Sequence, residues 1–361
     1  MRTLFRFLIA AFLWPAATAT AQSFPLQSVP ADSVEIEGFF WRDQLKYARE
    51  QRPELQPEPL SLETKDLRRV PSLTKQWEKA MSKASLEGIN GGNVKSTSQF
   101  VELCYRLARL TGDGRYSSAA EHMLVNTLCQ EDDPKATSTL LNLQENIYTT
   151  SGDHLYVNYP IRSQAHIVTP SLDLQLQCVT SSPWFNDRYI LWFNFNGPQR
   201  HMTLHLRLPS WMDTDTLTTF RSDRQPKLRP TKTADALILD HHIENGYLVI
   251  DKEWCDSDYV GVQINTPIYR VSDTTQPGLV AFQKGSVLYR MLELPDGMRV
   301  NPQEAVHSEF DADRHTNVLS GPYYDAKGQP AGRFSAEPYL FHRKQGPGGI
   351  FLPSLSSPAG N

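Results

Sequence analysis

The spacing of apolar residues divides this chain into a helical part and a longer part built from strands. Between residues 76 and 148, apolar side chains repeat every three or four positions, which is the period of a helix that buries one face. From about residue 152, apolar and polar residues alternate as they do along a strand. The change of period predicts an α+β fold, in which a short helical segment precedes antiparallel β-sandwich structure.

Three helices are expected, and they span Thr97–Leu110, Tyr116–Cys129 and Pro134–Tyr148. Ser96 and Gln99 have the spacing of a capping box at the start of the first helix, and the glycine-rich segment Thr111–Gly114 ends it. Glu102 and Arg106 have the spacing of an ion pair along one helix face. These amphipathic helices predict a small bundle or a cover over a sheet.

Strands follow from the alternating segments, which are Leu174–Cys178, Ile190–Phe195, Met202–Leu208, Tyr247–Ile250, Tyr259–Ile264, Ile268–Val271, Leu279–Phe282, Ser286–Leu292 and Gly349–Leu352. In Met202–Leu208 the leucines alternate with Thr203, His205 and Arg207, which predicts a strand with one wet face. Strand signals weaken from Asp296 to Ser335. The spacing of the strands is typical of a sandwich.

The N-terminus has the three parts of an export signal. Arg2 and Arg6 supply positive charge, Leu8–Trp14 is apolar, and Ala19–Ala21 offers small residues for cleavage. The apolar run is shorter than the roughly 20 residues that cross a bilayer. We therefore expect a signal peptide, a mature chain that begins near Gln22, and a secreted or periplasmic protein.

The domain order expected from these patterns has five parts. They are a signal peptide at 1–21, an extended lead-in at 22–75 with a strand near 34–41, a helical segment at 76–150, a β-sandwich at 151–272, and a C-terminal β segment at 273–361 that packs on the sandwich. Neither internal repeats nor low-complexity segments occur.

Composition narrows the range of partners. The net charge of -4 comes from well-mixed acids and bases, so no basic stripe is present for a nucleic acid backbone. Seven Trp and fourteen Tyr are compatible with stacking on sugars, although filling of sandwich cores explains them better. Trp184, Trp192 and Trp211 are the candidate sugar-binding aromatics.

The four cysteines are widely spaced and form no CxxC pair, so they predict neither a zinc ribbon nor a thioredoxin-type site. They are Cys104, Cys129, Cys178 and Cys255. Cys104 and Cys129 lie on neighbouring predicted helices, which makes them the pair best suited to a disulfide in an oxidising compartment. Buried thiols are an equally good interpretation.

Several short phrases occur in a fixed order along the chain: Val34–Leu45, Arg109–Tyr116, Glu145–Tyr148, Asp153–Asn158, His205–Trp211, Gly246–Ile250 with Trp254, Ala281–Gly285, Glu337–Tyr339 and Gln345–Gly348. Together they resemble the β-L-arabinofuranosidase-like glycoside hydrolases. The resemblance implies an (α/α)6 barrel that carries the active site, flanked by β-sandwich domains. Only two or three helices fit between Trp41 and Arg109, so most of that barrel is missing here.

The resemblance also implies a catalytic chemistry whose residues can be tested one by one. In the family a zinc-bound cysteine thiolate attacks the anomeric carbon, and a separate glutamate acts as acid and base. The family's E-x-C phrase falls here on Asn93 and Lys95, and its C-C-P-P-N phrase falls on Glu131–Lys135. A literal E-x-C occurs at Glu102 and Cys104 but lies too close to the following turn. Zinc is the family's cofactor, and its ligands are not matched.

A few side chains remain as candidates for chemistry. Cys129 and Glu131 are the candidate catalytic residues. Glu131, Asp132 and Asp133 could hold a hard cation, although a solvated acidic start to the following helix explains them better. The pair His241–His242 predicts no shared site, because neighbours on a strand point to opposite faces.

The sequence therefore leaves three functions open. The preferred one is a secreted, carbohydrate-directed relative of β-L-arabinofuranosidases that is catalytically impaired and still binds arabinose-containing glycans. The second is an active glycosidase with a relocated site. The third is a structural or interaction module whose sandwich no longer meets sugar.

Overall fold

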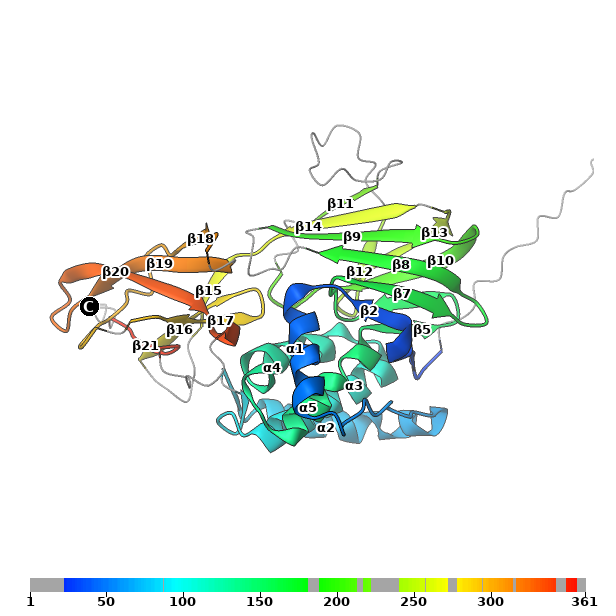
Figure 1. Cartoon of the computed structure of the whole chain (residues 1–361), viewed down its shortest axis with the longest axis horizontal. Helices are drawn as coiled ribbons and strands as arrows, with labels where there is room; N and C mark the ends of the chain where they lie inside the picture. Colours follow the sequence, from blue (N-terminus) through cyan, green and yellow to red (C-terminus); the bar gives the residue numbers. More distant parts are fainter. Residues whose placement is uncertain are drawn as a thin grey trace, which may run out of the picture.

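Helices and sheets occupy separate layers of this molecule (Figure 1). The computed structural model describes residues 23–86, 88–180, 188–212, 217–221, 240–256, 258–271, 278–293, 295–313, 316–341 and 349–355. The expected signal peptide at 1–21 lies outside the described residues. Within them, a few helices lie against a pair of sheets and a third sheet lies to one side, so the α+β prediction is confirmed.

The helices are α1 (Phe39–Gln51), α2 (Val70–Met81), α3 (Val94–Thr111), α4 (Gly114–Asn126) and α5 (Pro134–Leu141). Asn93 caps α3 by accepting a hydrogen bond from the Ser96 backbone, so the predicted capping box at Ser96 is wrong by one turn. Gly112 ends α3 in the left-handed conformation, with φ 62°, as its position predicted. None of the described helices is long and apolar enough to cross a membrane.

Helix α1 corrects the expected extended lead-in. Strand β2 (Val34–Ile36) ends five residues before Trp41, and α1 begins at Phe39. Leu45 and Ala48 face inward with Leu141 of α5 and form a small apolar cluster of their own. The apolar-aromatic stretch 34–41, in which apolar residues alternate with acids, suggested a strand, whereas packing of one face onto α5 stabilises a helix from Phe39 onward.

Helix α5 is shorter than predicted. It ends at Leu141, a 3-10 turn covers Gln144–Asn146, and β5 (Tyr148–Ser151) begins where the helix was expected to end. The backbone of Asn158 donates to the Ile147 carbonyl, and its side chain donates to the Asn146 carbonyl. The carbonyls of Asn146 and Ile147 therefore accept hydrogen bonds from the residue that follows β6, in place of bonds within a helix.

Two six-stranded sheets form the sandwich. The first has the order β1 (Gln27–Ser28), β5, β6 (His154–Val157), β10 (Arg200–Arg207), β13 (Tyr247–Trp254) and β12 (His242–Glu244). The second has the order β11 (Thr218–Arg221), β14 (Tyr259–Asn265), β9 (Arg188–Asn196), β8 (Asp173–Thr180), β7 (Ser163–Val168) and β2. Neighbouring strands are antiparallel except β6 and β10, which run parallel.

Strand β10 is buried on both faces. Leu204 and Leu206 belong to the large core that the sheets share with the helices. On the other face His205 is 5% exposed and Arg207 is 0% exposed, so the prediction of a wet face is wrong. Helix α4 and the chain around Leu26 cover this face, which the alternation along one strand does not reveal.

The C-terminal residues form a third sheet with a core of its own. Its order is β15 (Ile268–Val271), β16 (Leu279–Lys284), β17 (Val287–Met291), β20 (Pro330–Pro338), β19 (Thr316–Tyr324) and β18 (His307–Asp311), and β21 (Leu352–Pro353) pairs with β16. Three of these strands lie where the signals were weak. Asn126 of α4 fastens the sheet, since its amide donates to the Ser286 carbonyl at 2.7 Å and accepts from the Leu288 backbone at 2.9 Å.

One buried ion pair joins the helices to the sandwich. The Arg207 guanidinium donates to Glu121 of α4 at 3.0 Å, to the Ser118 hydroxyl at 3.0 Å and to the Asn158 carbonyl. It also lies 5.3 Å from the centre of the Tyr159 ring. Burial disfavours this charge, but the Glu121 carboxylate together with Tyr159 and Tyr247 outweighs that effect and raises the pKa of Arg207.

Gly114 permits the close approach that this ion pair needs. A Cβ at this position would lie 3.0 Å from the Gly246 carbonyl and 3.3 Å from Cγ of Arg207. The Gly114 backbone also donates to the Asn245 carbonyl at 2.8 Å. Helix α4 therefore starts in contact with the turn between β12 and β13.

Replacing Arg207 by methionine should lower the free energy of unfolding by about 3–5 kcal/mol, because Glu121 would keep a largely buried charge without its partner. The exposed Lys46–Glu50 pair is the control, and Lys46→Ala should cost about 0.3–0.5 kcal/mol. Urea denaturation measures both. A loss below about 1 kcal/mol for Arg207→Met would contradict a structural role for the pair.

Candidate functional site

A cleft of about 540 Å³ opens on the helical part. This volume lies in the usual range for small-molecule sites, roughly 300–1,000 Å³. The lining side chains come from the segment between α1 and α2, from α2, α3 and α5, and from the turn after α5. They are Glu58, Pro59, Leu60, Ser61, Arg69, Leu73, Gln76, Gln99, Glu102, Leu103, Tyr105, Arg106, Lys135, Asn142 and Asn146.

The amphipathic pattern of α3 provides one wall. Gln99, Glu102, Leu103 and Arg106 recur every three or four residues and line the cleft, while Cys104 is buried in the core. The opposite wall is the segment before α2, which is held by two hydrogen bonds. The Arg109 guanidinium donates to the Leu60 carbonyl at 2.7 Å, and the Glu58 backbone donates to the Asn142 side chain at 2.8 Å.

The charges in the cleft are only partly paired. Glu102 accepts hydrogen bonds from Lys135 and from the Thr139 hydroxyl, so its expected pairing with Arg106 is not the one the structure shows. Arg69 lies 3.6 Å from the Asp66 carboxylate. Arg106 forms no ion pair with any described residue, and its guanidinium is therefore available to a ligand in the cleft.

The buried thiols do not reach this cleft as nucleophiles. Cys104, Cys129 and Cys178 are each 0% exposed. Burial raises the pKa of Cys104 well above its ordinary value, so this thiol stays protonated at neutral pH. All four cysteines are thiols, so the Cys104–Cys129 disulfide is wrong and the alternative of buried thiols holds.

The acidic candidates lie apart from the cleft, and Glu131 and Asp132 line a separate, smaller pocket of about 240 Å³. Asp133 caps α5 by accepting hydrogen bonds from the Lys135 and Ala136 backbones at 2.7 and 3.3 Å. Asp132 accepts from the Tyr47 hydroxyl at 2.9 Å. Burial and the charges of Asp133 and Asp132 raise the pKa of Glu131. Within the described part of the chain, no three His, Cys, Asp or Glu side chains are arranged to hold a metal.

The described aromatic and histidine candidates do not lie together at one site. Trp211 is 7% exposed and belongs to the large core. Trp192 belongs to β9, opposite Val179, and Trp184 lies outside the described residues. His241 contacts the Thr219 hydroxyl at 3.4 Å, and His242 lies 3.6 Å from Glu244, so the two histidines have separate neighbours.

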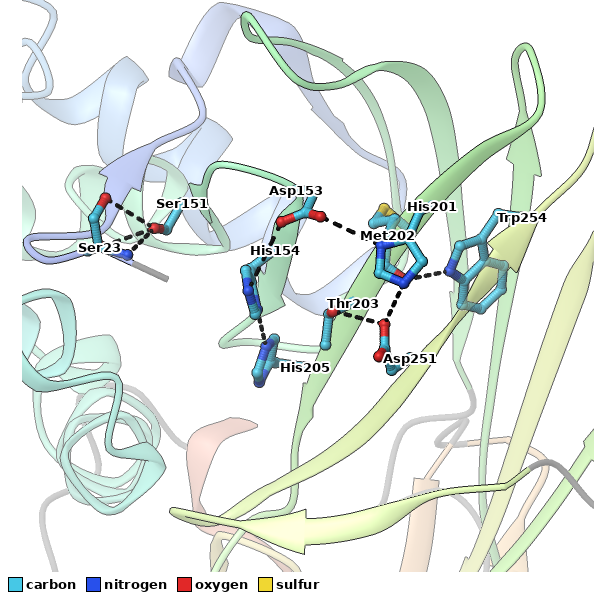
Figure 2. Close-up of polar contacts among 10 residues, drawn as sticks. All are labelled: Ser23, Ser151, Asp153, His154, His201, Met202, Thr203, His205, Asp251 and Trp254. Atoms are coloured by element: carbon cyan, nitrogen blue, oxygen red, sulfur yellow. Dashed lines mark hydrogen bonds and ion pairs between the residues drawn. The ribbon is translucent and has the colours of Figure 1, made fainter. Parts of the chain in front are cut away.

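The sequence did not reveal a row of acids and histidines that lies on the first sheet, on the same face as His205 (Figure 2). Asp251 lies 2.9 Å from Nε2 of His201, whose Nδ1 lies 3.3 Å from Asp153. Asp153 lies 3.8 Å from Nε2 of His154, whose Nδ1 lies 2.9 Å from Nε2 of His205. The alternating positions 201, 203 and 205 were the available signal, because they share one face of β10.

This row ties three strands together. His201 and His154 each use both ring nitrogens on neighbours within the row. At its buried end, His205 stacks on Tyr156 with ring centres 4.0 Å apart. Burial, with the charges of His154 and His242, lowers the pKa of His205 to about 3. His205 is therefore neutral in the folded protein, and the row is a structural network.

Acid should destabilise the protein through this histidine. The unfolded chain takes up a proton near pH 6.5, whereas folded His205 resists protonation until about pH 3. The stability it contributes is present above pH 6.5 and is lost as pH falls, by up to about 1.4 kcal/mol per pH unit. His122, whose pKa burial lowers to about 4, adds the same trend. Urea titrations from pH 7 to 5 should show His205→Gln with a shallower slope, and an unchanged slope would contradict the assignment.

The four cysteines should differ sharply in reactivity. Cys255 is exposed and should react at once with a chromogenic disulfide reagent, whereas Cys104, Cys129 and Cys178 should react only after unfolding. Thiol titration with and without guanidinium measures this. Cys255→Ser is the control and should abolish the rapid phase, and fast labelling of Cys129 in that variant would contradict its burial.

Comparison with solved structures identifies the fold. A GH127 β-L-arabinofuranosidase from Geobacillus stearothermophilus T6 is similar at 17% identity and a TM-score of 0.57, over 73% of this chain and 50% of that one. A second GH127 β-arabinofuranosidase is similar at 18% identity and a TM-score of 0.54, over 72% and 49%. A third structure, named a glycoside hydrolase, is similar at 14% identity and a TM-score of 0.56, over 72% and 52%.

These likenesses establish a fold related to that of glycoside hydrolases. No protein-family model matches the chain, and no curated protein matches it. The chain spans about half the length of the solved structures it resembles.

Proposed function

We propose that this chain is a secreted carbohydrate-binding protein that holds arabinose-containing glycans in the cleft beside α3 and is impaired as a hydrolase. The observation that carries the proposal is the cleft of about 540 Å³ with a polar, partly unpaired lining, in a fold related to glycoside hydrolases. The N-terminal export pattern supports the location outside the cytoplasm.

The lining suits a sugar. Gln76, Gln99 and Asn142 can donate and accept at the same time, which matches hydroxyl groups that also do both. Arg106 adds donors that no described carboxylate occupies. Leu60 and Leu73 supply apolar surface for the carbon-bound face of a sugar ring. Such a mixture of a few polar groups with apolar contacts is typical of small-molecule sites.

The impairment follows from the thiols and the acids. A glycosidase that attacks through sulfur needs an accessible thiolate, and Cys104 and Cys129 are fully buried. The two acids of the cleft differ in their surroundings. Glu102 is engaged by Lys135 and by the Thr139 hydroxyl, so its carboxylate is not free to face a substrate. Glu58 is exposed at the rim.

Binding tests the cleft directly. Isothermal titration with an L-arabinofuranosyl oligosaccharide should give saturable binding, and Arg106→Ala should weaken it about 10- to 100-fold, because hydrogen bonds to a charged group are lost. Arg106→Lys should lose less, since one charged donor remains. Arg333→Ala, which removes an exposed arginine on β20, should leave binding unchanged.

Turnover tests the impairment. An aryl β-L-arabinofuranoside should be hydrolysed no faster with the protein than in buffer, with or without added zinc. Hydrolysis that disappears in Cys129→Ser would instead reveal an active enzyme with a relocated nucleophile. Absence of both binding and turnover would favour a purely structural module.

A further inference from the structure

The outer face of the second sheet carries a grid of six polar side chains, four of them amides, that the cleft does not use. Strand register places them in two rows. One row is Glu35, Gln164 and Gln177 across β2, β7 and β8, and the other is His166, Gln175 and Asn196 across β7, β8 and β9. These strands lie side by side in Figure 1. We call these six residues the amide face.

Alternation along β8 explains why the face is polar. Leu174 and Leu176 are buried in the sandwich core, whereas Gln175 and Gln177 point the other way. The grid borders a shallow hollow of about 460 Å³, which is completed by Asp32, Ser33, Ala165 and Leu176. Gln164, Gln175, His166 and Asn196 are exposed there. The hollow lies on the sandwich, whereas the cleft lies on the helical part.

The chemistry of the amide face is uncharged at its centre. Gln175 and Gln177 offer both donors and acceptors without a net charge. Two carboxylates border this centre, Glu35 within the face and Asp32 at its edge, and Arg162 nearby lies 3.7 Å from Glu37. Neither a phosphate backbone nor a lipid surface would gain from such a face. A neutral polyhydroxylated ligand would.

The spacing of the strands favours an extended ligand. Neighbouring strands are roughly 4.8 Å apart, which is close to the length of one sugar unit. A polysaccharide lying across β7, β8 and β9 would therefore place successive sugars over successive strands, each within reach of an amide. The Gln164 amide nitrogen donates to Glu37 at 2.6 Å, and its side-chain carbonyl oxygen accepts no hydrogen bond from any described residue.

We propose that the amide face is a second glycan site, which binds a neutral polysaccharide chain across the strands of the second sheet. The choice of a glycan rests on the proposed function, but the site is separate from the cleft. The cleft takes the end of a glycan, and the amide face takes a length of the same polymer.

Affinity electrophoresis in gels that contain soluble arabinan tests the proposal. The Gln175→Ala/Gln177→Ala double variant should bind the polymer about tenfold more weakly than the wild type. The isosteric Gln175→Glu/Gln177→Glu variant should lose as much, because it removes the donors and adds charge. Gln329→Ala, an exposed glutamine on the turn before β20, should bind as the wild type does. Titration with the short arabinofuranosyl oligosaccharide should be unchanged in all of them, which also shows that they fold.

The outcomes separate the two sites. Equal retardation of the wild type and both double variants would overturn the amide face, and so would a wild type that arabinan does not retard. Sedimentation that shows a dimer broken by the same substitutions would overturn it too, since the face would then bind a second copy. If the double variants lose arabinan binding while the wild type itself does not bind the short oligosaccharide, the amide face is supported and the cleft is refuted.

Discussion

The architecture depends on the buried pair of Arg207 and Glu121. A guanidinium that is 0% exposed is tolerated only when its donors are satisfied, and here Glu121, Ser118 and the Asn158 carbonyl satisfy them together. These groups belong to α4, to β10 and to the turn after β6, so the pair requires all three to be in register. Helix α3 is joined to α4 by the tight turn at Gly112, so the position of α4 also determines that of α3 and of the cleft wall that α3 forms. This ion pair thus helps to fix how the helical part, which carries the cleft, packs on the sandwich.

Local patterns predicted elements well where one face decides the structure. The stripe of α3, its end at Gly112 and the alternation of β8 are of this kind. They failed where a distant segment decides. His205 and Arg207 alternate with leucines like solvent-facing residues, and only α4 and the chain around Leu26 make them buried. Helix α1 was hidden because its aromatic start suits a strand, while its stability comes from contact with α5. The repeat of apolar residues along a segment indicates which residues share a face, but it does not indicate which distant segment covers that face.

The cleft could not be predicted from local patterns for the same reason, because distant segments form it. The resemblance pointed to Cys104 and Cys129, which the fold buries, whereas the cleft is formed by segments whose residues are individually ordinary. Glu102 and Arg106 have the spacing of a helical pair, which is worth only about 0.3–0.5 kcal/mol on an exposed face. Lys135 of α5 takes Glu102 instead, with a further hydrogen bond from Thr139. This tertiary choice is what leaves Arg106 to a ligand, and no spacing within one helix could indicate it.

With both the proposed cleft site and the proposed amide face on one chain, a polymer could be retained even if each site alone binds weakly. The amide face offers mainly neutral hydrogen bonds, each of which contributes about 0.5–1.5 kcal/mol after water is displaced, and the cleft adds the charged donor Arg106. A short sugar therefore binds weakly at either place. A polymer that occupies both sites gains from the high effective concentration of its second segment, which raises retention by orders of magnitude without any new contact. Under the proposed function, retention of a polymer depends on two separated polar surfaces and needs no nucleophile.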